Sequence, residues 1–243
     1  MAVSNSMAQR TNIPDRPVEY QVNGEPVKLS PKIVRDYLVS GGGNVSDQEV
    51  VFFLNLCKHQ KLNPFVKDAY IVKYGNSPAA IVTSIGALLK RAKNTPTYAG
   101  HLAGVVVRDK NTGAVENRVG SLVLEGEDLV GGWAKVYVKG YEVPQENAVS
   151  LSEYIGTKSD GSVNSMWSGK PGTMIRKVAL AGALRECFPD DMGQLYAQEE
   201  IPGAEVEPDI MPGQIDQDTP PEAPAPQDDI FGGEPMETLP GGF

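Results

Sequence analysis

MWSGKPGTMIRKVALAGALRECFP, residues 166–189, holds the pattern that decides how this chain folds. Pro171 and Gly172 break the chain, and Thr173 is the expected N-cap of the helix that follows. From Met174 onward, apolar and small side chains cover most of the helix circumference, which predicts a helix buried on most sides. Its small residues allow a second backbone to come close: Ala179, Ala181, Gly182 and Ala183.

Three cations interrupt this apolar helix, namely Arg176, Lys177 and Arg185. A cation on a mostly buried helix is costly unless an anion meets it, and the phosphates of a nucleic acid are one such partner. Two structural roles stay open beside that one. Arg176 and Lys177 also suit a solvated helix edge, and Arg185 suits a C-terminal cation that complements the helix dipole.

A second block, QKLNPFVKDAY at residues 60–70, lies about a hundred residues before the first. Together the two blocks resemble the RecT/Redβ (Bet) family of phage single-strand annealing proteins. In the second block the resemblance rests on a Leu-Asn-Pro-aromatic motif, then a Lys-acid pair and a tyrosine. In the first it rests on this order of residues: Trp167, Pro171, Met174, Arg176, Lys177, Ala179, Arg185 and Phe188.

The resemblance implies a β-sheet packed with helices and a homo-oligomer, either a ring or a helical filament. It implies that Lys67 faces the DNA phosphates together with Arg176, Lys177 and Arg185 of the helix after Pro171, which we call the signature helix. It also implies that Trp167 lines the same DNA-binding groove. Single-stranded DNA and the annealed duplex are the implied partners, with a host single-strand binding protein or a phage exonuclease as further candidates. The chain departs from the family at Gly172 and Thr173, where some members carry basic residues.

The charge of the chain is divided between two regions. The net charge is −9, from 22 bases and 31 acids. All the bases lie at or before Arg185, whereas 12 of the acids follow Gly193, so the body carries about +3 and the tail about −12. A mildly basic body with an acidic tail suits a nucleic-acid binder whose cations are clustered.

The pattern of elements predicts an α+β fold, in which a central antiparallel β-sheet with hairpins is packed by helices. Capping signals predict helices at 32–39, 47–60 and 85–93, and alternation predicts strands at 69–74, 79–83, 100–109, 118–125 and 133–141. We expect three regions: a flexible N-terminal segment at 1–29, a DNA-binding and oligomerising annealing core at 30–192, and a disordered acidic Pro/Gly-rich tail at 193–243.

Binding of single-stranded DNA needs cations along the backbone and aromatic platforms for the bases. Trp167 is expected in a polar loop with a contact role, whereas core packing is favoured for each strand tyrosine: Tyr70, Tyr74, Tyr98 and Tyr137. The candidate phosphate-binding residues are Lys67, Lys73, Lys90, Arg91, Arg108, Lys135, Lys139, Lys170, Arg176, Lys177 and Arg185.

Several chemistries are disfavoured. The fragment Ser168–Pro171 has proline where a phosphate-binding loop needs Ser or Thr, so no ATP site is expected. Cysteines and histidines are too scattered for zinc, and a carboxylate-bound nuclease metal at 125–128 or 190–191 is a minor alternative. No cofactor or metal is expected. Two cysteines, no secretory signal pattern and no membrane-length apolar run favour the cytoplasm of a bacterial host.

These observations predict an ATP-independent single-strand annealing protein of phage homologous recombination, which performs no covalent chemistry. It would bind single-stranded DNA and annealed intermediates in a basic groove of an oligomer. One alternative is a protein that protects single-stranded DNA, or mediates its handling, without annealing it. Another is a phage structural or scaffolding protein whose cations bind protein acids.

Overall fold

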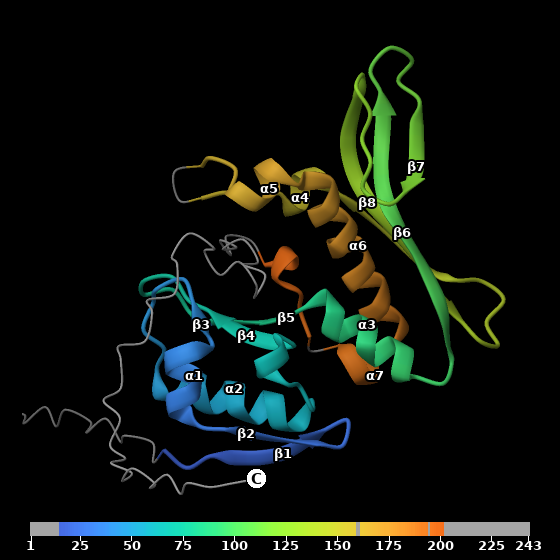
Figure 1. Ribbon diagram of the computed structural model, residues 1–243. Helices are drawn as coiled ribbons and strands as arrows, with labels where there is room; N and C mark the ends of the chain where they lie inside the picture. The colour runs from blue at the N-terminus through green and yellow to red at the C-terminus, as the bar shows by residue number, and fades with distance from the viewer. Residues whose placement is uncertain (1–14, 159–160, 194, 202–243) are drawn as a thin grey trace, which may run out of the picture. The chain divides into compact units, whose positions relative to one another are not determined.

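The computed structural model describes residues 15–158, 161–193 and 195–201, with the side chain of residue 198 left out. Within them lie helices and three β-sheets of two, three and four strands (Figure 1). The expected α+β class, with antiparallel hairpins packed by helices, is confirmed. The expected tail falls almost wholly on 202–243, outside the described residues.

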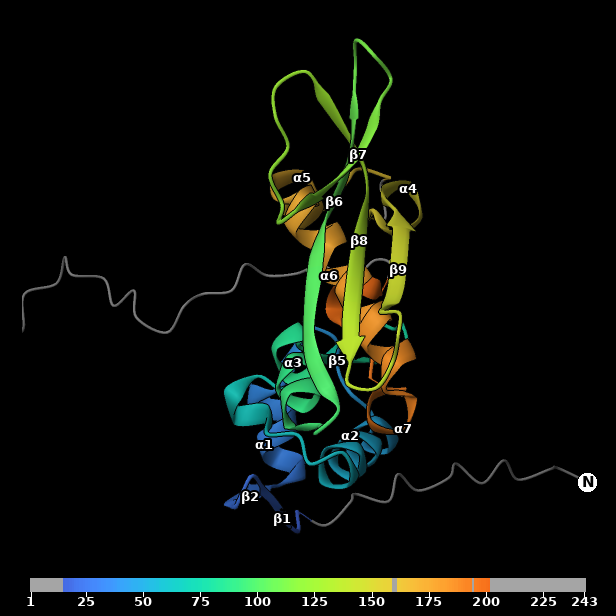
Figure 2. The same cartoon turned by 90° about the vertical axis from the view of Figure 1, so that its right-hand side faces the viewer.

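The four-stranded sheet has the order β7-β6-β8-β9, and every pairing in it is antiparallel. Its long central strands, β6 (Tyr98–Asp109) and β8 (Glu127–Val138), lie side by side in front of the signature helix in Figure 2. The edge strand β7 (Val115–Val119) begins earlier than expected, and β9 (Gln145–Ser150) is a strand that the sequence pattern did not predict.

The N-terminal elements form two smaller sheets and two helices. β1 (Val18–Val22) pairs with β2 (Glu25–Leu29), which corrects the expectation of a flexible segment through residue 29. A parallel pairing joins β3 (Val39–Ser40) to β4 (Ala69–Val72), and β4 pairs antiparallel with β5 (Ala80–Thr83). The helices are α1 (Pro31–Tyr37) and α2 (Asp47–His59).

Serine caps fix the helix starts as the sequence predicts. Ser30 accepts a hydrogen bond from the third residue of α1, and Ser84 does the same for α3 (Ile85–Asn94). Ser46 and Glu49 form a reciprocal capping box at the start of α2. Each cap satisfies backbone N–H groups that the first helical turn leaves without a partner.

The signature helix α6 (Pro171–Cys187) begins at its proline, so the expected N-cap at Thr173 is wrong. Proline suits the first helical position because its missing N–H would have no partner there. Trp167 lies in the short helix α5 (Ser165–Gly169) rather than in the polar loop expected around it, and a further short helix, α4 (Leu151–Tyr154), follows β9. Short helical turns complete the chain: η1 (Pro64–Val66), α7 (Pro189–Met192) and η2 (Gln198–Glu200).

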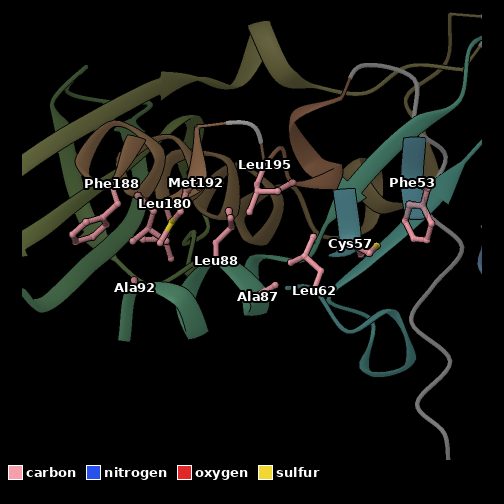
Figure 3. Close-up of a cluster of buried hydrophobic side chains, with 14 of the residues drawn as sticks. Phe53, Cys57, Leu62, Ala87, Leu88, Ala92, Leu180, Phe188, Met192 and Leu195 are labelled. Atoms are coloured by element: carbon pink, nitrogen blue, oxygen red, sulfur yellow. The ribbon is translucent and has the colours of Figure 1, made fainter. Parts of the chain in front are cut away.

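One apolar core joins α6 to the N-terminal elements. Leu180 and Phe188 belong to the same buried cluster as Leu88 of α3 and Phe53 of α2 (Figure 3). A second cluster lies under the other half of α6, where Val105 and Val107 of β6 meet Trp167, Met174, Ile175 and Val178. The prediction that α6 is buried on most sides is therefore confirmed.

Glu49 also ties α2 to the connection between β4 and β5. Its carboxylate accepts hydrogen bonds from Lys73 Nζ, at 2.7 Å to both oxygens, and from the Ala79 backbone N–H at 2.9 Å. The Lys73 ammonium, and then these backbone donors, lower the pKa of Glu49 from 4.5 to about 2. Since the folded pKa lies below the unfolded one, this stabilisation is present above pH 4.5 and is lost as the pH falls toward 2.

Glu49→Gln is therefore expected to lower the free energy of unfolding at pH 7 by about 2 kcal/mol, because buried Lys73 loses its anion. Urea denaturation of wild type and variant between pH 2 and pH 7 measures this effect. The wild type should lose more stability than the variant between pH 4.5 and pH 2. Glu25→Gln on β2 is the control, with an expected change below about 0.5 kcal/mol. Equal pH dependence in all three proteins would contradict the assignment.

Candidate nucleic-acid interface

Helix α6 packs so closely on the four-stranded sheet that glycine, which has no Cβ, is needed at the contact. A Cβ on Gly132 of β8 would stand 2.5 Å from the backbone oxygen of Ile175. Further along, the Asn147 side chain of β9 donates to the Ala179 carbonyl at 3.2 Å, and a Cβ on Gly182 would stand 2.2 Å from that amide nitrogen. The small residues of α6 therefore serve this close approach.

The three cations of α6 have different partners. Arg176 contacts the sheet, where its Nε donates to the Ala103 carbonyl of the inner strand β6 at 3.2 Å. Lys177 and Arg185 instead contact Glu199 and Glu200 beyond the helix. The three signature cations therefore do not converge on one point of the folded chain.

Arg176 lies within a basic cluster that also contains Lys93 and His101. Burial lowers the pKa of His101, and the positive charges of Arg176 and Lys93 lower it further. His101 Nδ1 is also hydrogen-bonded to the Tyr98 hydroxyl at 2.6 Å. In the described part of the chain no carboxylate forms an ion pair with Arg176 or Lys93. Both cations thus disfavour protonation of His101, and neither has a carboxylate partner among the described residues.

Arg185 and Lys177 contact the segment that follows α7. Arg185 Nη1 donates to Glu200 Oε2 at 2.6 Å, and its Nη2 forms a second hydrogen bond with the same carboxylate. The guanidinium also lies 4.7 Å from the ring centroid of Tyr196. Lys177 Nζ donates to Glu199 at 2.9 Å. The sequence assigned these two acids to the disordered tail, because acid and proline enrichment is the compositional signal there.

The remaining candidate cations are spread over several elements. Lys67 and Lys170 are exposed, while Arg91 and Lys139 each donate to a backbone carbonyl, of Asp191 and Pro96, at 2.9 Å. The others meet carboxylates: Lys73 with Glu49 at 2.7 Å, Lys90 with Asp68 at 3.8 Å, Arg108 with Asp128 at 3.2 Å and Lys135 with Glu146 at 2.6 Å. Lys73 is buried, so its ammonium serves Glu49 and does not face solvent.

The aromatic candidates divide between core and surface. Trp167 is only 4% exposed and belongs to the second apolar cluster, which differs from the expected contact role in a polar loop. Tyr70 and Tyr74 pack beside Val72, and Tyr98 packs against the main core, in agreement with the structural role favoured for strand tyrosines. Tyr137, 37% exposed on β8, is the one candidate aromatic side chain at the surface of the described sheet.

A cavity of about 400 Å³ brings Lys90 and Arg91 together with His59 and Lys61. Burial lowers the pKa of Arg91, while the nearby acids Asp191 and Asp68 raise it. His59 and Lys61 in this cavity, and Lys93 near His101, are basic residues that were not among the predicted site residues. Lys93 follows Lys90 and Arg91 on the same helix, so the position of these cations off the apolar stripe was a usable signal for it.

Metal and membrane sites are not found in the described residues. No group of three or more potential metal ligands gathers there. Cys57 is buried in the main core, and burial raises the pKa of its thiol to about 12. Among the described helices, none has the length and hydropathy that crossing a bilayer requires.

The described residues thus form an α+β fold in which α6, with its small residues and three cations, packs on an antiparallel sheet. The chain belongs to the RecT family, whose model matches residues 25–212. It is also similar to an uncharacterised protein of Ureaplasma parvum serovar 3, with 30% identity over 137 residues. That match covers 56% of this chain and 51% of the relative, so the chain spans about half the length of that relative.

Proposed function

We propose that this protein binds single-stranded DNA and anneals complementary strands without ATP, in phage homologous recombination. Membership of the RecT family supports the class of activity. The proposed site comprises the basic cluster of Arg176, Lys93 and His101, extended by exposed cations such as Lys139 and Lys170.

The observation that carries the proposal is that Arg176, which contacts β6 through the Ala103 carbonyl, and Lys93 each lie near His101, with no carboxylate paired to either cation among the described residues. Bringing cations together costs electrostatic free energy that an internal carboxylate would normally offset. None does so within the described residues, and the two cations are close enough to His101 to lower its pKa. A phosphate backbone supplies the missing anions and fits the Arg176 guanidinium, whose terminal nitrogens make no hydrogen bond with the described residues.

Annealing then follows from charge neutralisation and alignment. Cations that contact only phosphates leave the base edges readable, so a second strand can test its register. A homo-oligomer, ring or helical filament, would hold one strand over many subunits and retain the paired duplex. Base pairing supplies the specificity, and binding is expected to be independent of sequence and sensitive to salt. A host single-strand binding protein and a phage exonuclease are candidate partners in the bacterial cytoplasm.

The test is the annealing rate of two complementary dye-labelled oligonucleotides without ATP, for wild type and Arg176→Gln. Glutamine removes the charge but keeps an N–H donor for the Ala103 carbonyl, so the variant should stay folded. We expect DNA affinity about tenfold weaker and a salt dependence of log K reduced by about 0.7, since one phosphate contact is lost. Lys28→Gln, which removes an exposed charge paired with Glu19, is the matched control.

The other outcomes separate the alternatives. Wild-type DNA binding without faster annealing identifies a protective or mediator protein. Absence of DNA binding by the folded wild type rejects the nucleic-acid function and favours a scaffolding role. Equal weakening by Arg176→Gln and Lys28→Gln would move the site away from the basic cluster.

A further inference from the structure

Residues 195–201 form an acidic strap that is attached to β5 and to α6. The Thr83 backbone N–H donates to the Tyr196 carbonyl at 2.9 Å, and Thr83 and Ala197 form a parallel β-bridge. Leu195 and Ala197 are buried in the main core, where Figure 3 shows Leu195 beside Leu88. This first half of the acidic strap is therefore anchored by apolar burial and by a strand contact.

The second half of the acidic strap is held by charge. Glu199 meets Lys177, and Glu200 takes both terminal nitrogens of Arg185, as described above. The Glu200 carboxylate also accepts the Ala197 backbone N–H at 2.7 Å. The exposed fractions of the two acid side chains are only 10% for Glu199 and 5% for Glu200. Two neighbouring acids are thus paired with two of the three cations of α6, Lys177 and Arg185.

Carboxylate and phosphate compete for the same donors of a guanidinium. Both accept two parallel N–H bonds from arginine, so Arg185 cannot give its fork to Glu200 and to DNA at once. A buried carboxylate that loses its cation carries an uncompensated charge, which is strongly unfavourable. Binding of a phosphate by Arg185 therefore requires Glu200 to leave its buried position and enter solvent.

We propose that Glu199 and Glu200 occupy a second phosphate site in cis, and that a DNA phosphodiester displaces them when the strand binds. This inference rests on the proposed function. The displacement pivots after Ala197, while Leu195 and Ala197 stay in the core. Arg185 keeps the Leu195 carbonyl, at 3.4 Å, and the Tyr196 ring, and exchanges only its carboxylate for a phosphate. An anion then binds at Lys177 and Arg185 only if its affinity for them is high enough to displace both carboxylates.

The test compares binding of a dye-labelled oligothymidine to wild type and to Glu199→Gln/Glu200→Gln across a salt series. We expect the double variant to bind more tightly at low salt, with the slope of log K against log salt steeper by about 1.4, because two cations become available. That slope predicts that its advantage falls by about sevenfold when the salt rises from about 50 to about 200 mM. Glu142→Gln/Glu153→Gln removes two exposed acids outside the acidic strap and outside α6, and is the charge-matched control.

A second set of variants ties the gain to the two cations. Adding Lys177→Gln and Arg185→Gln to the double variant should remove the gain in affinity and return the slope to the wild-type value. Equal or weaker binding by a folded Glu199→Gln/Glu200→Gln protein overturns the proposal. So does an equal gain in the charge-matched control.

Amide hydrogen exchange on the wild type supplies a readout that needs no variant. Displacement of Glu200 frees the Ala197 N–H from its carboxylate, so exchange in residues 197–201 should become faster when oligothymidine binds. Slower or unchanged exchange in a DNA-bound protein overturns the acidic-strap proposal and leaves DNA binding itself standing. Failure of the wild type to bind oligothymidine rejects instead the proposed function on which it rests.

Discussion

Trp167→Ala is expected to lower the free energy of unfolding by about 4 kcal/mol, because it removes the largest side chain of the second apolar cluster. The indole packs among Val105 of β6 and Met174, Ile175 and Val178 of α6. Its backbone N–H donates to the buried Asn164 side chain at 3.0 Å, which fixes α5 in place. Urea denaturation followed by circular dichroism measures the loss.

This result separates a packing role from a DNA-stacking role for Trp167. A packing role predicts that Trp167→Phe recovers most of the stability and all of the DNA affinity, because the phenyl ring still fills most of the site. A stacking role predicts the reverse for Trp167→Ala: normal stability with weakened binding to oligothymidine. That second pattern would contradict the buried position of the indole.

Gly132→Ala has the second largest expected effect, a loss of about 3 kcal/mol. The added methyl group would stand 2.5 Å from the Ile175 oxygen and 2.8 Å from its carbonyl carbon. Both are backbone atoms of α6, so relief requires the helix to move off the sheet rather than a side chain to rotate. Since Arg176 follows Ile175 directly, we also expect weaker DNA binding at temperatures where the variant is folded.

Gly169→Ala is the matched control for this substitution. Gly169 lies in α5, and a Cβ there meets no atom within 4 Å, so the change should be neutral or slightly stabilising. Thermal melting of both variants gives the comparison. Equal melting temperatures for Gly132→Ala and wild type would show that α6 is not held against β8 as closely as described.

Local rules predicted much of the fold. Ser30, Ser84 and the Ser46–Glu49 box mark helix starts by hydrogen bonds that span three residues, so the sequence suffices to find them. The signature helix was found because its apolar and small residues fill most of its circumference. Two short blocks in the right order also predicted the family, which the family model confirms.

Local patterns failed where burial depends on distant residues. Trp167 has polar neighbours in the sequence, yet its partners lie on β6 and α6, and Gly156 lies close beside the indole. The sequence of β9 is mostly polar for two reasons. Only one of its faces is turned to α6, and on that face Asn147 is kept polar because it donates to the Ala179 carbonyl. The β1–β2 hairpin was missed for a different reason, because its local signals were overlooked: Val18, Tyr20 and Val22 alternate with polar residues, and Asn23–Gly24 forms the turn.

By itself, then, the sequence determined the family, the caps, the apolar helix and the candidate cations, since these depend on short-range spacing. Tertiary structure alone decided which cations have an internal anion. Lys73 meets Glu49 from 24 positions away, and Arg185 meets Glu200 from 15 positions away, whereas no carboxylate of the described residues pairs with Arg176 or Lys93. Charge pairing acts over a few ångströms in space, and only the fold sets those distances.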